Sequence, residues 1–185
     1  MPPLMRKFFW FLNKFFIVPI FRLGLGGIFS NPFSGYIMVL KVIGRKSSKL
    51  RYAPVNYTIY KGSVWCISGG RKSSDWYKNL QVTPAIEMIM PGGALYGQMS
   101  EEADPEIRRI VIRQVLKNAG FAGFFEGYNP WKISDEEMMT KIGDIPLLKI
   151  TPLGIGNGAS DPSGWAWITM LGLTILLIVL LIVLL

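Results

Sequence analysis

Histidine is missing from this 185-residue sequence, and cysteine occurs once, at Cys66. Without histidine, the chain cannot form a Ser-His-Asp triad, a histidine metal site or histidine ligation of haem. A single cysteine cannot form an internal disulfide, and the apolar residues around Cys66 favour a buried structural thiol over a reactive one. Any chemistry must therefore depend on a cofactor or on carboxylates, and we predict no metal site.

Acidic residues are also few, twelve against twenty lysines and arginines. Most of them fall in two groups, at residues 101–106 and directly after Ser134. Carboxylates near a helix N-terminus interact favourably with the helix dipole, and Asp104 and Ser134 are typical N-cap residues. Helix capping explains both groups better than a catalytic pair of acids.

Positive charge is concentrated in one part of the chain. Residues 41–78 contain nine lysines and arginines against Asp75 alone, which equals the formal net charge of +8 for the whole sequence. Two basic segments with glycine and serine, 44–54 and 68–80, each follow an apolar run that predicts a strand. In such turns, backbone N–H groups, hydroxyls and arginines can bind phosphate or carboxylate oxygens. We predict a phosphorylated or polycarboxylated ligand, although the first segment by itself could be a solvated hairpin tip.

Familiar nucleotide and nucleic-acid motifs do not occur. The sequence has neither a G-x-G-x-x-G fingerprint nor a Walker loop. Trp76 and Tyr77 are neighbours rather than a spaced platform for stacked bases, so we predict no nucleic-acid partner.

The remaining pattern predicts a domain built mostly of strands. A helix is predicted at 75–82 and a longer one from Pro105, with Asp104 as its N-cap. About 120 residues form one domain, which is large enough for a single apolar core. The predicted strands are residues 36–43, 51–60, 63–68, 85–90, 94–100 and 145–150.

The basic segments carry motifs in a fixed order. They are Gly44-Arg45-Lys46-Ser47, Arg51-x-x-Pro54, Ser68-Gly69-Gly70 and Trp76-Tyr77-x-Asn79-Leu80-x-x-x-Pro84. As a set they resemble the deazaflavin-dependent nitroreductase and quinone reductase family, over about residues 22–152. The resemblance implies a mainly β fold with helices, a split β-barrel of the FMN-binding type. It also implies that the protein binds coenzyme F420 and passes its hydride to quinones, nitroaromatics or similar acceptors.

The resemblance further implies two groups of cofactor-binding residues. The phosphate and glutamate tail of the coenzyme would be held by Arg45, Lys46, Ser47 and Arg51. Its backbone and ring would lie along Pro54, Ser68, Gly69, Gly70, Trp76, Tyr77 and Asn79. The sequence departs from the family in two places: Ser48 stands where glycine is common, and the segment between Gly70 and Trp76 is about one residue shorter and lacks the usual proline.

Aromatic residues lie ahead of the last predicted strand, where family members often have tyrosines. We predict that the acceptor contacts Phe124, Phe125, Tyr128 and Trp131. No catalytic side chain is assigned, with Tyr128 as the candidate, because the cofactor carries the hydride and the pocket has only to align the acceptor.

The C-terminal residues predict a membrane anchor. Residues 165–185 form an uncharged run of 21 residues, which is about 31 Å as a helix, against roughly 30 Å for the hydrocarbon core of a bilayer. We expect a C-terminal transmembrane helix, a single-pass tail anchor, with Trp165 and Trp167 at the headgroup interface and the basic domain on the cytoplasmic side. Residues 153–164 predict a flexible linker to a barrel domain at 31–152.

Residues 1–30 predict an amphipathic segment that associates with the membrane. A helix over about 5–18, ended by Pro19, would place Arg6, Lys7, Asn13 and Lys14 on one side. The opposite side would carry Phe8, Phe11, Leu12, Phe15 and Phe16. Such a helix either lies in the membrane plane or packs on the barrel. A signal peptide is less favoured, because Asn13 and Lys14 interrupt the apolar run.

We therefore expect an oxidoreductase of the cell membrane that transfers hydride from a reduced deazaflavin to a lipophilic small-molecule acceptor, such as a membrane quinone. Its partners would be that acceptor and the lipid bilayer, and a homodimer stays open. Two alternatives also stay open: a split-barrel reductase that uses FMN, and a non-catalytic membrane protein that binds an anionic ligand or lipid headgroup.

Overall fold

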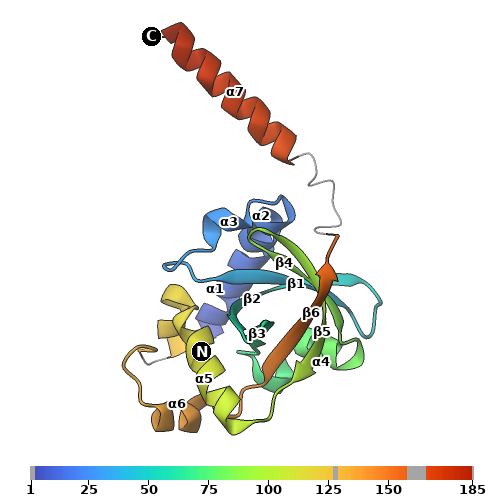
Figure 1. Cartoon of the computed structure of the whole chain (residues 1–185), viewed down its shortest axis with the longest axis vertical. Helices are drawn as coiled ribbons and strands as arrows, with labels where there is room; N and C mark the ends of the chain where they lie inside the picture. Colours follow the sequence, from blue (N-terminus) through green and yellow to red (C-terminus); the bar gives the residue numbers. More distant parts are fainter. Residues whose placement is uncertain (1–2, 127–128, 158–165, 185) are drawn as a thin grey trace.

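The computed structural model describes residues 3–126, 129–157 and 166–184. Within them, antiparallel strands close into a barrel in the order β1-β2-β3-β6-β5-β4 (Figure 1). The predicted barrel fold and its strands are thus confirmed, except that the last strand continues to Ile155, beyond the predicted start of the linker at residue 153. The strands are β1 (Ile37–Ile43), β2 (Leu50–Tyr60), β3 (Ser63–Ile67), β4 (Ala85–Met90), β5 (Gly93–Glu101) and β6 (Leu147–Ile155).

The first strand is covered on both sides, as its nearly continuous apolar sequence predicted. Met38, Leu40 and Val42 point into the barrel, where they pack in its main apolar core. Val39 points outward and packs against Phe21 of the N-terminal segment. The barrel wall therefore separates two apolar clusters.

A helical layer covers another side of the barrel. Helix α5 (Pro105–Lys117) and helix α6 (Asp135–Ile142) pack their apolar faces against Trp65 and Leu147. The predicted caps are present: Asp104 Oδ1 accepts a hydrogen bond from Ile107 N at 2.9 Å, and Ser134 Oγ accepts one from Glu137 N at 3.1 Å. The shorter elements are η2 (Arg71–Ser73), α4 (Asp75–Val82), whose Tyr77 and Leu80 pack in the barrel core, and η3 (Gly120–Glu126), which follows α5.

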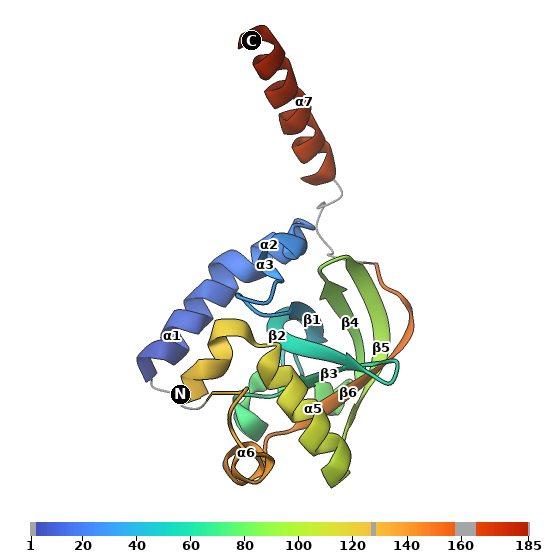
Figure 2. The ribbon, with the colours of Figure 1, turned by 60° about the vertical axis from the view of Figure 1, so that its left-hand side comes forward.

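The N-terminal segment is one long helix that packs along the barrel (Figure 2). It consists of α1 (Pro3–Leu12), a π-helical turn η1 (Asn13–Ile17) and α2 (Val18–Arg22), and a short α3 (Gly26–Phe29) follows. The prediction that Pro19 ends the helix is wrong. In the π turn the N–H of Val18 donates to the carbonyl of Asn13, and this wider turn relieves the clash between a proline ring and the preceding turn.

Helix α7 (Ala166–Leu184) stands apart from the barrel (Figure 1). From Leu171 to Leu184 all of its residues are exposed and uncharged. Among the described residues, none of the helices combines the length and the apolar character needed to cross a bilayer. The transmembrane helix over 165–185 is therefore not confirmed, and Trp165, the side chain of Trp167 and residues 158–164 of the predicted linker lie outside the described residues.

Candidate functional site

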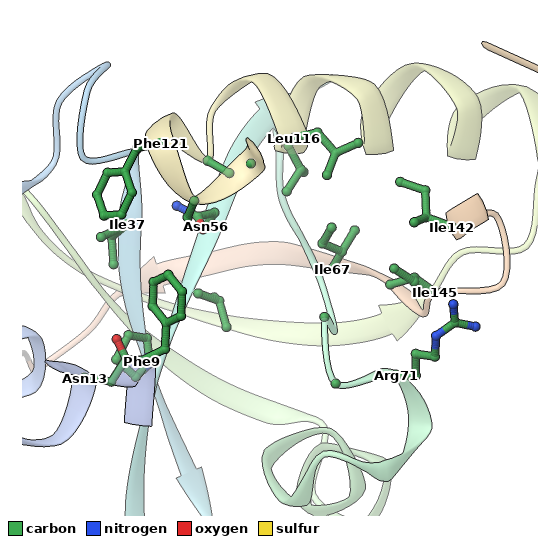
Figure 3. A pocket seen from close by; sticks show the side chains of 18 of the residues that line it. Phe9, Asn13, Ile37, Asn56, Ile67, Arg71, Leu116, Phe121, Ile142 and Ile145 are labelled. Carbon is green, nitrogen blue, oxygen red and sulfur yellow. The ribbon is translucent and has the colours of Figure 1, made fainter. Parts of the chain in front are cut away.

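A cavity of about 590 Å³ lies between β2, the end of β3, the C-terminal part of α5 and the N-terminal helix (Figure 3). Phe9, Ile37 and Phe121 gather at one end of it, and Arg71 lies at the other. Most of its lining side chains are apolar, which suits a planar, poorly hydrated ligand.

Four of the predicted cofactor-binding residues line this cavity together: Pro54, Gly69, Gly70 and Trp76. A Cβ atom at Gly69 would meet nothing within 4 Å, so the backbone there is open to an approaching ligand. A Cβ atom at Gly70 would lie 2.3 Å from Ser74 Oγ, so a side chain at this position would displace Ser74. At Gly69 the backbone of this glycine pair is thus open to a ligand, and Trp76 lines the same cavity.

The basic turn between β1 and β2 lies close along the chain to this cavity. The N–H groups of Ser47 and Ser48 both donate to the Gly44 carbonyl, at 3.1 and 2.8 Å, which closes the turn. The side chains of Lys46, Ser47, Lys49 and Arg51 are exposed. Arg51 precedes Pro54 by three residues, roughly 10 Å along a strand, so exposed cations lie within reach of a ligand that extends out of the cavity.

The side chain of Arg45, in the basic turn, forms hydrogen bonds with residues of another element, α4. Its Nη1 donates to Asn79 Oδ1 at 2.9 Å, and its Nη2 donates to Asp75 Oδ1 at 3.0 Å. Asn79 Oδ1 also accepts from the Arg45 backbone N–H at 3.2 Å. Arg45 and Asn79 therefore fasten the basic turn to α4.

Two further predicted residues have partners inside the protein. Tyr77 is 6% exposed in the barrel core, and its hydroxyl donates to Glu101 Oε2 at 2.6 Å. This hydrogen bond and burial raise the pKa of Tyr77 to about 12. Ser68 is fully buried and its Oγ donates to the Arg71 carbonyl at 2.8 Å. Neither side chain is among the residues that line the cavity.

Two of the four aromatic residues predicted to contact the acceptor have described side chains, those of Phe124 and Trp131. Phe124 is 50% exposed and Trp131 is 64% exposed, with Lys117 Nζ 5.0 Å from its ring centroid, and neither lines the cavity. Tyr128 and the side chain of Phe125 lie outside the described residues. Among the described aromatic side chains of this region, that of Phe121 lines the cavity.

Several lining residues escaped the sequence analysis. Phe9 and Asn13 reach the cavity from the N-terminal helix, which the motifs did not include. The amphipathic pattern of that helix did not indicate them, because it placed Asn13 on the polar side and Phe9 on neither side. Ile37, Asn56, Ile142 and Ile145 carried no local signal, because isolated residues of the barrel and helices do not differ in sequence from core positions.

The ionisable side chains in the described cavity wall are Arg71 and Lys141. Arg71 forms an ion pair with Asp144, and its Nη2 donates to the Lys141 carbonyl at 3.5 Å. Its φ of +53° is in the left-handed region, which turns η2 sharply after Gly70. Among the described lining residues there is no carboxylate, thiol or phenol, and this wall can bind and orient a ligand.

A family model for F420H(2)-dependent quinone reductase matches residues 21–127. Comparison with curated proteins gives no match. A solved structure of an F420-H2 dependent reductase is 22% identical, with a TM-score of 0.40, over 62% of this chain and 92% of its own. A conserved hypothetical protein from Mycobacterium tuberculosis is 17% identical, with a TM-score of 0.48, over 68% of this chain and 77% of its own. The heme storage protein HutZ from Vibrio cholerae is 13% identical, with a TM-score of 0.45, over 78% of this chain and 96% of its own.

Proposed function

Because the chain belongs to the F420H(2)-dependent quinone reductase family, we propose that it reduces a lipophilic quinone with hydride from its cofactor, coenzyme F420, at the surface of a membrane. Family membership makes it an F420-dependent oxidoreductase. The quinone, the membrane and the residues that hold the cofactor are the proposal. When bound in its reduced form, this coenzyme supplies the hydride.

The described residues fit such a cofactor. The observation that carries the assignment is that Pro54, Gly69, Gly70 and Trp76 line one cavity, although they lie on three different elements. They would hold the planar ring system, with the indole of Trp76 as an apolar surface and the glycine pair allowing close approach. The exposed side chains of the basic turn, Lys46, Ser47, Lys49 and Arg51, would bind the anionic tail.

The role of the protein would be to position the reactants and to exclude water. Phe9, Ile37 and Phe121 form an apolar end of the cavity, where a lipophilic acceptor would lie against the ring system. The described wall holds no carboxylate, thiol or phenol, so alignment would supply most of the catalytic effect.

Two exposed apolar surfaces support the membrane location. On the N-terminal helix, Ile17 and Phe21 are buried against the barrel, while a stripe of aromatic side chains is exposed on its other side. That stripe consists of Phe8, Trp10, Phe11, Phe15 and Phe16, each 48–60% exposed. The second surface is α7, and the uncharged sequence 165–185 is longer than the part whose side chains are described. We propose that both segments enter the cytoplasmic leaflet of the cell membrane.

The cofactor assignment is tested by titrating coenzyme F420 and, separately, FMN into the protein in mild detergent, with tryptophan fluorescence as the signal. We expect F420 to quench Trp76, which lines the cavity. Lys46→Ala should weaken F420 binding roughly 10- to 100-fold, because a hydrogen bond to a charged group is worth about 1.5–3 kcal/mol.

Lys61→Ala is the matched control, because it removes the same charge at the turn after the far end of β2. It should leave the affinity for F420 unchanged. Equal losses in both variants would show that general charge, rather than the basic turn, holds the tail. Binding of FMN with higher affinity than F420 would overturn the placement of the cofactor.

A further inference from the structure

Three segments of the chain carry no charged residue: 23–40, 88–100 and 150–160. In a sequence with 17% charged residues, gaps of this length are conspicuous outside the apolar C-terminal run. Each segment contributes residues to the barrel core, but each also contains a stretch that the core does not bury.

The fold brings these stretches to one end of the barrel (Figures 1 and 2). A Cβ atom on Gly27 of α3 would lie 3.7 Å from the carbonyl oxygen of Pro91, in the turn between β4 and β5. The N–H of Gly156, directly after β6, donates to the carbonyl of Ala94 at 2.8 Å, just after the same turn. We call this end the rim: α3, the turn at residues 91–93 and residues 153–155 of β6.

The rim exposes large apolar side chains instead of covering them. Ile28 is 62% exposed and Phe29 is 39% exposed on α3. Leu153 and Ile155 are 63% and 90% exposed at the end of β6. Exposed apolar groups that lie together without charges mark a surface that leaves water when a partner is present.

The rim is also the place from which the C-terminal run departs. Ten residues, 156–165, separate the end of β6 from the start of α7. Ten residues span at most about 36 Å even when fully extended. If α7 lies in a membrane, as in the proposed function, the rim cannot lie far from the same membrane.

We propose that the rim rests in the interfacial layer of the bilayer, as a membrane contact separate from α7 and from the aromatic stripe of the N-terminal helix. The partner is uncharged in the region of contact, because the rim offers apolar side chains and no ion to a headgroup. This contact fixes which end of the barrel faces the membrane. The inference rests on the proposed function only in that α7 must be inserted.

The test uses the full-length protein on phosphatidylcholine vesicles, with an environment-sensitive fluorophore on an introduced cysteine. Ile28→Cys and Ile155→Cys place the label on the rim, and Val82→Cys is the matched control. Val82 is 65% exposed, about as much as Ile28, and it precedes β4, whose other end reaches the rim roughly 20 Å away. Cys66 is buried and should not take up the label.

On binding to vesicles, we expect the emission of both rim labels to shift to the blue and to be quenched by nitroxide lipids, while the Val82 label stays in water. Rim labels that remain aqueous on vesicle-bound protein would overturn the inference and leave the anchor intact. Failure to float with the vesicles would overturn both. Rim labels that are shielded without lipid, in proportion to protein concentration, would identify a second copy as the occupant and also overturn it. F420 binding, measured in the same samples, reports independently on the oxidoreductase.

Discussion

Ser48 shows how a single departure from the family pattern acts on the basic turn. Its φ is +52°, in the left-handed region that glycine adopts without steric cost. A serine in this conformation is strained by about 1 kcal/mol. The stability gained by replacing it with glycine is smaller than this strain, because glycine has more conformational freedom in the unfolded chain. We predict that Ser48→Gly raises the free energy of unfolding by about 0.5 kcal/mol, measured by urea denaturation.

Ser47→Gly is the control for that prediction. The φ of Ser47 is not positive, and its Oγ accepts from the Lys49 N–H at 3.4 Å, so glycine there removes a contact and adds only flexibility. This variant should be slightly less stable than the parent protein. If both substitutions changed stability in the same direction, backbone strain at Ser48 would not be the cause.

Cys66 gives a second prediction at this scale. Burial in the barrel core raises the pKa of its thiol from 9.0 to about 12. At pH 8, we expect negligible alkylation by iodoacetamide until urea unfolds the protein, because the thiolate is the nucleophile. The raised pKa also means that Cys66 contributes stability below pH 9 that is lost as the pH rises towards 12. Alkylation of the native protein as fast as of the unfolded one would contradict this placement.

The sequence motifs indicated which residues lie near the site, but they did not indicate what each of these residues does there. Trp76 and Tyr77 are neighbours on α4, and successive helical residues point about 100° apart, so the two side chains need not face the same surface. Trp76 lines the cavity, and Tyr77 points into the barrel core. Which of the two faces the ligand depends on how α4 is docked, and the sequence near the motif does not contain that information.

At the scale of elements, Asp135 joins helices α5 and α6. It forms an ion pair with Arg109, and its Oδ1 accepts from Arg113 Nε at 2.7 Å. These hydrogen bonds lower the pKa of Asp135 below 3.8. A lowered pKa in the folded state contributes stability that is present above pH 3.8 and is lost as the pH falls through the folded-state value.

We therefore predict that Asp135→Asn lowers the urea midpoint at pH 7, and that the difference from the parent protein shrinks as the pH falls below 4. Glu136→Gln, one residue along, is the control, because the Glu136 side chain is exposed. It should not alter the pH profile. A constant difference between Asp135→Asn and the parent at all pH values would refute the ion-pair explanation.

Helix boundaries were predictable where they depend on local caps and were missed where they depend on packing. Asp104 and Ser134 begin α5 and α6 as expected, because a cap needs only the adjacent backbone. Pro19 failed as a stop signal, because Ile17 and Phe21 on either side of it are both buried against the barrel. That packing favours a continuous helix with a π turn. The rule that proline ends a helix considers only neighbouring residues and takes no account of such packing.

At the scale of the whole molecule, the prediction concerns the C-terminal run. Truncation after Asp161 removes α7 but leaves every barrel strand, since β6 ends at Ile155. We expect the truncated protein to partition much less into membranes, with residual binding through the aromatic stripe of the N-terminal helix. Its rate of reduction of a long-chain quinone in vesicles should fall, while its rate with a water-soluble quinone should not.

A matched control replaces Phe11 and Phe15 on the exposed stripe with serine in the full-length chain, which should remove only the residual binding. Equal membrane association of the truncated and full-length proteins would refute the anchor.

The strand pattern was enough to predict the barrel, because alternation and turn residues are local signals. The N-terminal helix as a wall of the cavity was not predictable, because that contact joins Phe9 to residues more than a hundred positions away.

Closure of the barrel has a consequence for biosynthesis. Strand β6 lies between β3 and β5, so these two strands keep unpaired edges on the ribosome until the chain has been made through Ile155. Unpaired strand edges can pair with other nascent chains. The apolar C-terminal run follows β6, the strand that closes the barrel, after ten residues. We expect the nascent chain to need protection by chaperones in this interval, and we expect variants that weaken β6 to be lost by aggregation during synthesis.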